Sequence, residues 1–135
     1  MITSVTLKEG MFFNGNLNGF EIPIDADEAV GGQNRGPRPK GLMLTALAGC
    51  TAMDVISILR KMRHEPDAFS VEVDADLSEE HPRVYTEIRI VYRLKGKLDR
   101  EKVEKAVVLS QDRYCGVSAM LKEAAPIRYD IIIED

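Results

Sequence analysis

Hydrophobic and polar residues alternate in three parts of the chain, and this pattern predicts β-strands. Short alternating runs punctuated by Gly and Asn occupy residues 2–30, which is typical of strands joined by tight turns. Longer runs at residues 69–78 and 84–96 keep a hydrophobic residue at every second position, so we expect a hairpin with one buried and one solvated face. The run at residues 127–134 predicts a final strand.

The most apolar segment predicts a long central helix. Four glycines and two prolines in residues 29–41 exclude a helix until after Pro39, and the apolar run then extends from about Leu42 to Arg63. Apolar residues lie on nearly every side of this helix, so it must be covered on all sides. One sheet of the available size covers a single face, and we therefore expect a homodimer. The wholly apolar part is too short to span a bilayer, so no membrane partner is expected.

Helical spacing returns in the last third of the chain. Residues 98–114 predict an amphipathic helix with Asp99 as its N-cap, and residues 117–125 predict a short helix. The order is strands, helix, hairpin, helix, strand. It predicts a single α+β domain, residues 1–135, in which antiparallel sheet packs on helices.

Composition and charge narrow the possible partners. The formal net charge of −4 argues against nucleic acid or anionic membranes as main partners, although a basic cluster, Arg60-Lys61-Arg63, ends the central helix. We interpret that cluster as a solvated helix end. The N-terminal residues do not resemble a signal peptide, so we expect a cytoplasmic protein whose thiols are reduced.

Two cysteines are the candidate chemistry. Cys50 lies in the middle of the apolar helix, where it could be a small buried hydrophobe and nothing more. Cys115 precedes a short helix, whose N-terminus favours a thiolate, so the local sequence predicts that Cys115 is the more acidic thiol. Together they could form a redox pair, in which one thiolate is oxidised by a peroxide and the other condenses with it. No histidine stands at metal-ligand spacing from either cysteine, so no metal or other cofactor is expected.

Two stretches of sequence resemble the OsmC/Ohr family, the osmotically inducible protein C and organic hydroperoxide resistance group. They are PRPKGLMLTALAGCTAMDVISILRKM and YCGVSAMLKEAAPIRYDI, and the resemblance is greatest to the smaller OsmC-like proteins. It implies an OsmC-like fold, with antiparallel sheets packed on central apolar helices, and an intertwined homodimer with active sites at the subunit interface.

The resemblance also implies a function. It is that of a thiol-dependent peroxidase, without haem or metal, which reduces organic hydroperoxides and hydrogen peroxide in the oxidative stress response. Carried over by position, Cys50 is the attacking thiol and Cys115 the resolving thiol, and they form a Cys50–Cys115 disulfide. This assignment reverses the local expectation about acidity. The implied partners are a second copy of the chain, a small-molecule peroxide and a thiol reductant of lipoyl or thioredoxin type.

Two residues of the family pattern are missing. A glutamate usually lies nine or ten positions before the first cysteine, where this chain has Gly41 and Lys40. The family arginine comes from the N-terminal strands, but residues 1–34 contain none. Arg35 and Arg38 are the nearest substitutes, either as activators of the thiol or as solvated loop charges. The alternative function is therefore an OsmC-fold dimer with weak or lost peroxidase activity that binds a small apolar ligand or is purely structural.

Several other residues carry weaker expectations. Asp54 lies one helical turn after the first cysteine, and we expect it to be a buried partner of an arginine or a backbone donor rather than a catalytic base. Ser118 is expected in the cap or first turn of the short helix. Met43, Met53 and Met120 are expected in the core.

Overall fold

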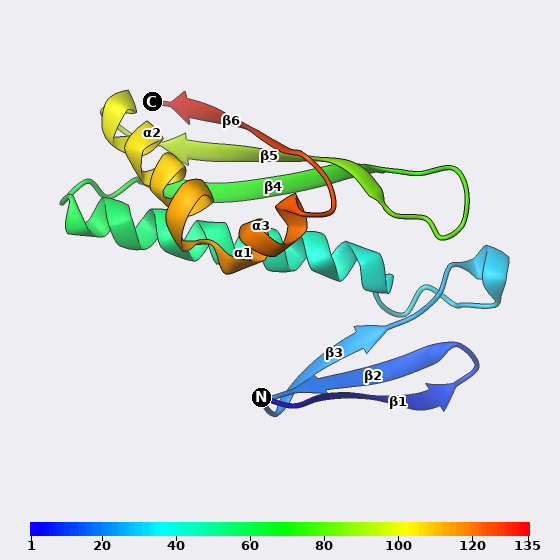
Figure 1. Ribbon diagram of the computed structural model, residues 1–135. Coiled ribbons are helices and arrows are strands. Elements are labelled where there is room, and N and C mark those ends of the chain that lie inside the picture. Colours follow the sequence, from blue (N-terminus) through cyan, green and yellow to red (C-terminus); the bar gives the residue numbers. More distant parts are fainter. The chain divides into compact units, whose positions relative to one another are not determined.

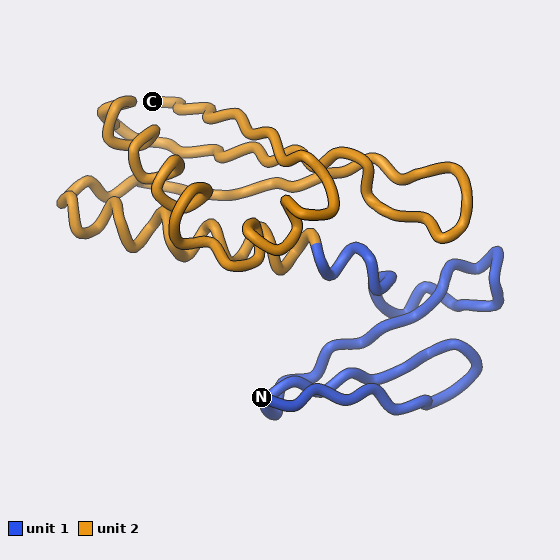
Figure 2. Tube along the Cα trace, in the orientation of Figure 1, with its two compact units in different colours: residues 1–43 blue, residues 44–135 orange.

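The computed structural model describes residues 1–135, which form two compact units, residues 1–43 and residues 44–135 (Figure 2). The first unit holds an antiparallel sheet in the order β1 (Thr3–Glu9), β2 (Phe12–Leu17), β3 (Phe20–Ile24). A short 3₁₀ helix, η1 (Glu28–Val30), follows it. The strands predicted in residues 2–30 are confirmed, and every residue of β1 is exposed.

Helix α1 (Pro39–Lys61) begins three residues before the predicted start. Proline is favoured at the first helical position, because the N–H that it lacks has no partner inside the helix. The helix ends two residues before the predicted end, and Arg63 beyond it has a left-handed backbone with φ 55°. At 23 residues, α1 is long and apolar enough by length and composition alone to cross a membrane, although the helix also includes charged residues beyond its wholly apolar part. Core helices of soluble proteins share these properties.

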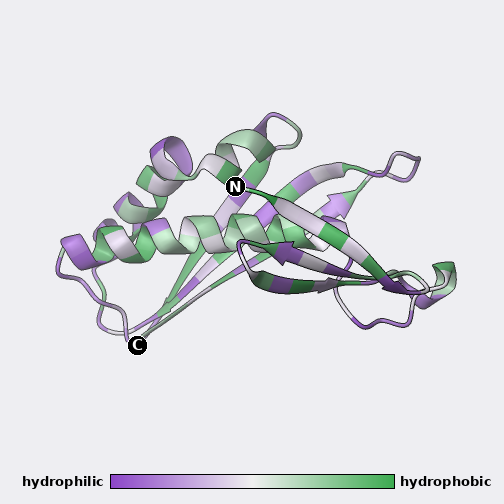
Figure 3. Cartoon of the chain, turned by 90° about the horizontal axis from the view of Figure 1, so that it is seen from below, coloured by the Kyte–Doolittle hydropathy of each residue, from purple (hydrophilic) through white to green (hydrophobic).

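The buried side of α1 is a single stripe with a spacing of four residues. It consists of Leu47, Thr51, Val55 and Leu59. The prediction that the methionines lie in the core is wrong for the single chain, since Met43, Met53 and Met120 are 46%, 72% and 69% exposed. Met43 and Met53 lie on α1 outside this buried stripe. Figure 3 shows other hydrophobic residues along α1 as well.

The second unit pairs its helices with one sheet, in the order β4 (Ala68–Leu77), β5 (Tyr85–Lys95), β6 (Ile127–Glu134). The hairpin β4–β5 is antiparallel as predicted. Inward residues of β5 (Ile88, Ile90, Tyr92 and Leu94) join the core with residues of the helices, which lie over one face of the sheet (Figure 1). The α+β class is confirmed. However, β6 pairs with β5 in parallel, so the expectation of antiparallel pairing is wrong at this edge. The helical connection crosses over the sheet and returns the chain in the same direction.

The connection between β5 and β6 contains helix α2 (Arg100–Leu109), a π-helical turn η2 (Ser110–Tyr114) and helix α3 (Gly116–Lys122). Asp99 caps α2 as predicted, because its carboxylate accepts a hydrogen bond of 3.0 Å from the Glu101 N–H. The segment predicted as one helix over residues 98–114 consists of α2 followed by the wider η2, so the helix changes pitch at Ser110. Wide turns of this kind are frequent at functional sites.

Candidate active site

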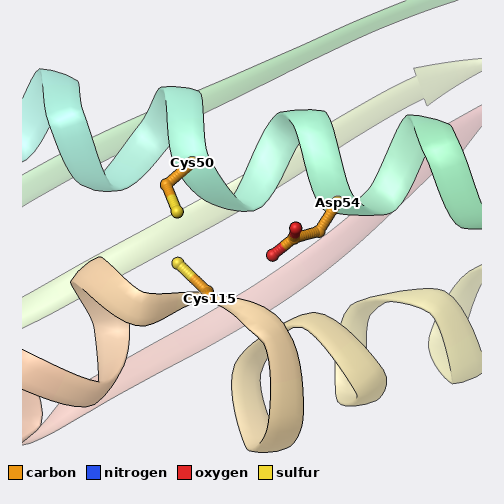
Figure 4. A group of neighbouring side chains, drawn as sticks. All are labelled: Cys50, Asp54 and Cys115. Atoms are coloured by element: carbon orange, nitrogen blue, oxygen red, sulfur yellow. The ribbon is translucent and has the colours of Figure 1, made fainter.

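Two cysteines and one carboxylate converge between α1 and the start of α3. The Sγ atoms of Cys50 and Cys115 and a carboxylate oxygen of Asp54 all lie within 4.8 Å of one another. Cys50 and Asp54 lie on one face of α1 because four residues separate them, and Figure 4 shows both side chains directed toward Cys115. The predicted proximity of the two sulfur atoms is thus observed.

Backbone hydrogen bonds hold Cys115 in place. Its N–H donates to the carbonyl oxygen of Ser110 at 2.7 Å and so closes the π-helical turn. Cys115 then adopts an extended backbone and caps α3, with its Sγ accepting a hydrogen bond of 3.4 Å from the Ser118 N–H. Ser118 is in the first turn of α3, as predicted. The Cys115 side chain is buried, whereas Cys50 is half-buried.

The surroundings of Cys115 make it a weak acid. Burial raises the pKa of Cys115 to about 11, and the nearby Cys50 sulfur and Asp54 carboxylate add to the rise. The Ser118 N–H acts in the opposite direction but does not offset them. The local sequence expectation that the helix end makes Cys115 acidic is therefore wrong, because it took no account of burial or of the neighbouring Cys50 and Asp54.

A chain of buried hydroxyl groups ends at Asp54. Ser110 Oγ donates to Asp54 Oδ2 at 2.9 Å, and Thr51 Oγ1 lies 2.7 Å from both Ser110 Oγ and the Tyr92 hydroxyl. Each hydroxyl carries one proton, so donation runs from Tyr92 through Thr51 and Ser110 to the carboxylate. Asp54 is held by a hydroxyl and not by the expected arginine or backbone donor.

Gln111 joins this chain to α3. Its Nε2 donates to Thr51 Oγ1 at 3.2 Å and to the Tyr92 hydroxyl at 2.9 Å, while its Oε1 accepts from Ser118 Oγ at 2.7 Å. The Lys122 ammonium donates to the Gln111 carbonyl at 2.6 Å. No buried side-chain nitrogen or oxygen lacks a partner. This network was not predicted from the sequence, although a threonine inside the buried stripe of α1 was a signal for it.

A hollow beside Asp54 opens the cluster to solvent. It has a volume of about 350 Å³ and is lined by Asp54, Ser57, Ile58, Lys61, Leu109 and Tyr114. Its walls are mainly apolar, with one ammonium group and one carboxylate. The carboxylate side of the cluster is therefore accessible, while Cys115 itself stays buried.

The two candidate arginines make contacts within the first unit. Arg35 Nε lies 3.4 Å from the buried Asp25 carboxylate and Nη1 lies 3.3 Å from Glu9, while its guanidinium stacks 4.6 Å from the centre of the Phe12 ring. Burial alone would raise the pKa of Asp25, but N–H donors of Arg35 and its neighbours lower it below the usual value.

Arg38 is bound within its own loop. Its Nη1 donates to Asn34 Oδ1 at 2.6 Å and to the Gly36 carbonyl at 3.1 Å, and its Nη2 lies 3.8 Å from Asp27. These bonds hold Arg38 on the segment that leads into α1. A role for either arginine at Cys50 stays a prediction.

Known proteins share this fold and sequence pattern. The protein-family model described as OsmC-like protein matches residues 32–130. Protein YhfA of Escherichia coli K12 is 34% identical over 123 residues, which cover 90% of this chain and 89% of YhfA. A hypothetical protein from Aquifex aeolicus VF5 superposes with a TM-score of 0.83 at 29% identity, over 99% of this chain and 97% of that one. The organic hydroperoxide resistance protein OhrB of Bacillus subtilis shares the fold, with a TM-score of 0.69 at 18% identity over 97% and 98% of the two chains. The chain therefore belongs to the OsmC-like protein family.

Proposed function

We propose that this protein is a cytoplasmic two-cysteine peroxidase that reduces organic hydroperoxides and hydrogen peroxide. The observation that carries the proposal is the facing pair of sulfur atoms, Cys50 on α1 and Cys115 before α3, within 4.8 Å. Family membership supports it, because relatives of the same fold are named for organic hydroperoxide resistance.

The reaction uses both sulfur atoms in turn. The Cys50 thiolate attacks one peroxide oxygen, the O–O bond breaks, and the sulfur is oxidised to a sulfenic acid while the leaving alkoxide takes a proton and departs as an alcohol. Cys115 then attacks the Cys50 sulfur, the S–S bond forms, and hydroxide leaves with the thiol proton as water. A dithiol of lipoyl or thioredoxin type restores both thiols by exchange and becomes oxidised itself.

The charges around the pair support this order of events. Because the pKa of Cys115 is raised to about 11, Cys115 remains a thiol at neutral pH while the more exposed Cys50 meets the peroxide. Oxidation turns Cys50 into a neutral sulfenic acid and removes one of the groups that raise the pKa of Cys115. Cys115 then ionises more readily, at the step that needs its thiolate.

The proposal also includes an intertwined homodimer built as one domain per chain. It is supported by the exposed apolar side chains of α1, among which Met53 is 72% exposed, because a helix this apolar needs cover on more than one side. In the dimer, Arg35 or Arg38 supplies the guanidinium that holds the Cys50 thiolate. Arginine suits this task because its planar fork can bind two atoms at once.

The test is a count of free thiols after mixing reduced protein with a slight excess of cumene hydroperoxide. We expect the wild type to lose both free thiols within minutes. Its mass should fall by that of two hydrogen atoms, as disulfide formation requires. Cys50→Ser should keep its remaining thiol, and Cys115→Ser should accumulate a sulfenic acid on Cys50 that dimedone traps. Retention of both thiols by the wild type, or consumption of the Cys115 thiol in Cys50→Ser, would refute the mechanism.

One observation favours a second function, a dimer that binds a small apolar ligand and has lost peroxidase activity. The family glutamate is absent, with Lys40 and Gly41 in its place. A hollow of about 520 Å³ lies along α1, where Met53 and Ile56 supply an apolar wall beside Ser57, Arg60 and Lys61. Under this alternative peroxide consumption is negligible, and native mass spectrometry of freshly purified protein shows a bound small molecule.

A further inference from the structure

The reduced cluster has the donor atoms that a thiophilic cation prefers. Zn²⁺ binds cysteine sulfur and carboxylate oxygen in tetrahedral geometry, and it deprotonates the thiols that it binds. Cys50, Cys115 and Asp54 offer two sulfurs and one oxygen within 4.8 Å of one another. No ligand spacing is visible in the sequence, because Asp54 and Cys115 are 61 positions apart and only the fold brings them together.

The spacing of the donor atoms is close to what a tetrahedral site needs. Zn–S bonds of about 2.3 Å place two sulfur ligands about 3.8 Å apart. Since no separation in the cluster exceeds 4.8 Å, a contraction on the order of 1 Å brings the three atoms into range. Rotation about the side-chain bonds of the half-buried Cys50 and Asp54 can supply this movement.

The surrounding groups complete the site. Ser110 Oγ orients the Asp54 carboxylate at 2.9 Å, and Thr51 in turn holds Ser110 at 2.7 Å, which is the arrangement by which outer groups orient metal ligands. The hollow of about 350 Å³ beside Asp54 gives a cation a route to the cluster. It also leaves room for water as a fourth ligand.

We propose that the reduced protein binds one divalent thiophilic cation of the zinc class per chain through Cys50, Cys115 and Asp54. Two metal–sulfur bonds and one metal–oxygen bond form, any proton on either thiol passes to solvent, and no group is oxidised or reduced. A disulfide between the cysteines removes both thiolate donors, so the oxidised protein does not bind the metal. The consequence that bound metal blocks peroxide reduction rests on the proposed peroxidase function, whereas the binding itself does not.

The experiment is a titration of reduced protein with Cd²⁺, followed by the ultraviolet absorbance of cadmium–thiolate bonds, with Zn²⁺ as competitor. We expect one Cd²⁺ per chain and no thiolate absorbance in the double variant Cys50→Ser/Cys115→Ser. Asp54→Asn keeps an acceptor for Ser110 and should weaken binding at least about 10-fold. Asp112→Asn is the matched control, because Asp112 is an exposed carboxylate on η2 and the change in charge is the same.

Each outcome decides a separate part of the proposal. Absence of cadmium–thiolate absorbance in the wild type overturns the metal site, and equal affinities of Asp54→Asn and Asp112→Asn overturn the role of the carboxylate. Saturating Zn²⁺ should protect both thiols from cumene hydroperoxide, and a chelator should restore their reaction. If protein stripped of metal does not react with peroxide but binds Cd²⁺, the peroxidase proposal fails and the metal site stands. If the stripped protein reacts with peroxide but binds no Cd²⁺, only the metal site fails.

Discussion

Replacement of Thr51 by valine tests the buried hydroxyl chain that ends at Asp54. Thr51 has no exposed surface, and its Oγ1 makes three hydrogen bonds, with Tyr92, Ser110 and Gln111. Valine has almost the same shape as threonine, so the substitution removes the hydroxyl and leaves most of the packing in place. The Tyr92 hydroxyl then keeps a proton that no acceptor takes.

The expected cost follows from the number of bonds lost. At about 1 kcal/mol of net stability for each hydrogen bond, Thr51→Val loses three bonds and about 3 kcal/mol, and Tyr92→Phe loses two bonds and about 2 kcal/mol. The two residues share one bond, so the double variant loses four bonds and about 4 kcal/mol, less than the sum of about 5 kcal/mol. The expected coupling energy is therefore at least about 1 kcal/mol. It is larger still because the double variant also removes the Tyr92 hydroxyl that Thr51→Val alone leaves without an acceptor.

The assay is equilibrium unfolding in urea of the wild type, both single variants and the double variant. All four are compared at one protein concentration, because dimerisation would link stability to concentration. Thr86→Val, at an exposed threonine, is the control and should change stability by less than about 0.5 kcal/mol. If the costs of Thr51→Val and Tyr92→Phe sum to the cost of the double variant within about 0.5 kcal/mol, no continuous chain joins the two residues.

Further predictions concern the thiol pair, a helix end and the dimer. Because the Asp54 carboxylate adds to burial and to Cys50 in raising the pKa of Cys115 to about 11, Asp54→Asn should lower that pKa in NMR titrations of ¹³C-labelled cysteine, and an unchanged value would contradict the electrostatic account. In the wild type, unfolded Cys115 ionises near its ordinary pKa of 9.0 and the folded form near 11, so its contribution to stability is complete below pH 9 and is lost as pH rises to about 11 in urea titrations. Asp99→Ala should cost about 1 kcal/mol in the same assay, whereas Asp99→Asn, which keeps a capping oxygen, should cost much less. Met53→Glu should convert the expected dimer to monomer in sedimentation velocity, and a monomeric wild type would contradict the dimer.

Local patterns were sufficient for most elements of the fold and insufficient for one strand pairing. Alternation with a period of two predicted β4 and β5, and the Asp99 cap was visible because capping depends on residues next to one another. The parallel direction of β6 was not visible. It depends on the path by which α2, η2 and α3 cross the sheet, and no local pattern encodes that path.

The candidate site likewise has features that local spacing predicts and features that depend on tertiary packing. Cys50 and Asp54 were expected on one helical face, since that follows from a spacing of four residues. The hydrogen bonds of Thr51 join residues 41 and 59 positions apart, so they depend on tertiary packing and could not be predicted. The acidity of Cys115 was predicted wrongly for the same reason: burial and neighbouring charges come from distant segments, and they outweigh the short helix that follows.

The negative charge of the cluster sets a test for the two arginines. Cys50, Cys115 and Asp54 can together carry up to three negative charges, and a guanidinium beside Cys50 would compete with a divalent cation for the same charge. Arg35→Ala and Arg38→Ala should therefore differ in the cadmium titration. The variant that removes the arginine bound to Cys50 should bind Cd²⁺ more tightly than the wild type and react more slowly with peroxide, while the other should change neither. If both variants match the wild type in both measurements, neither arginine activates the thiol, and the cation that does so must be sought elsewhere in the chain.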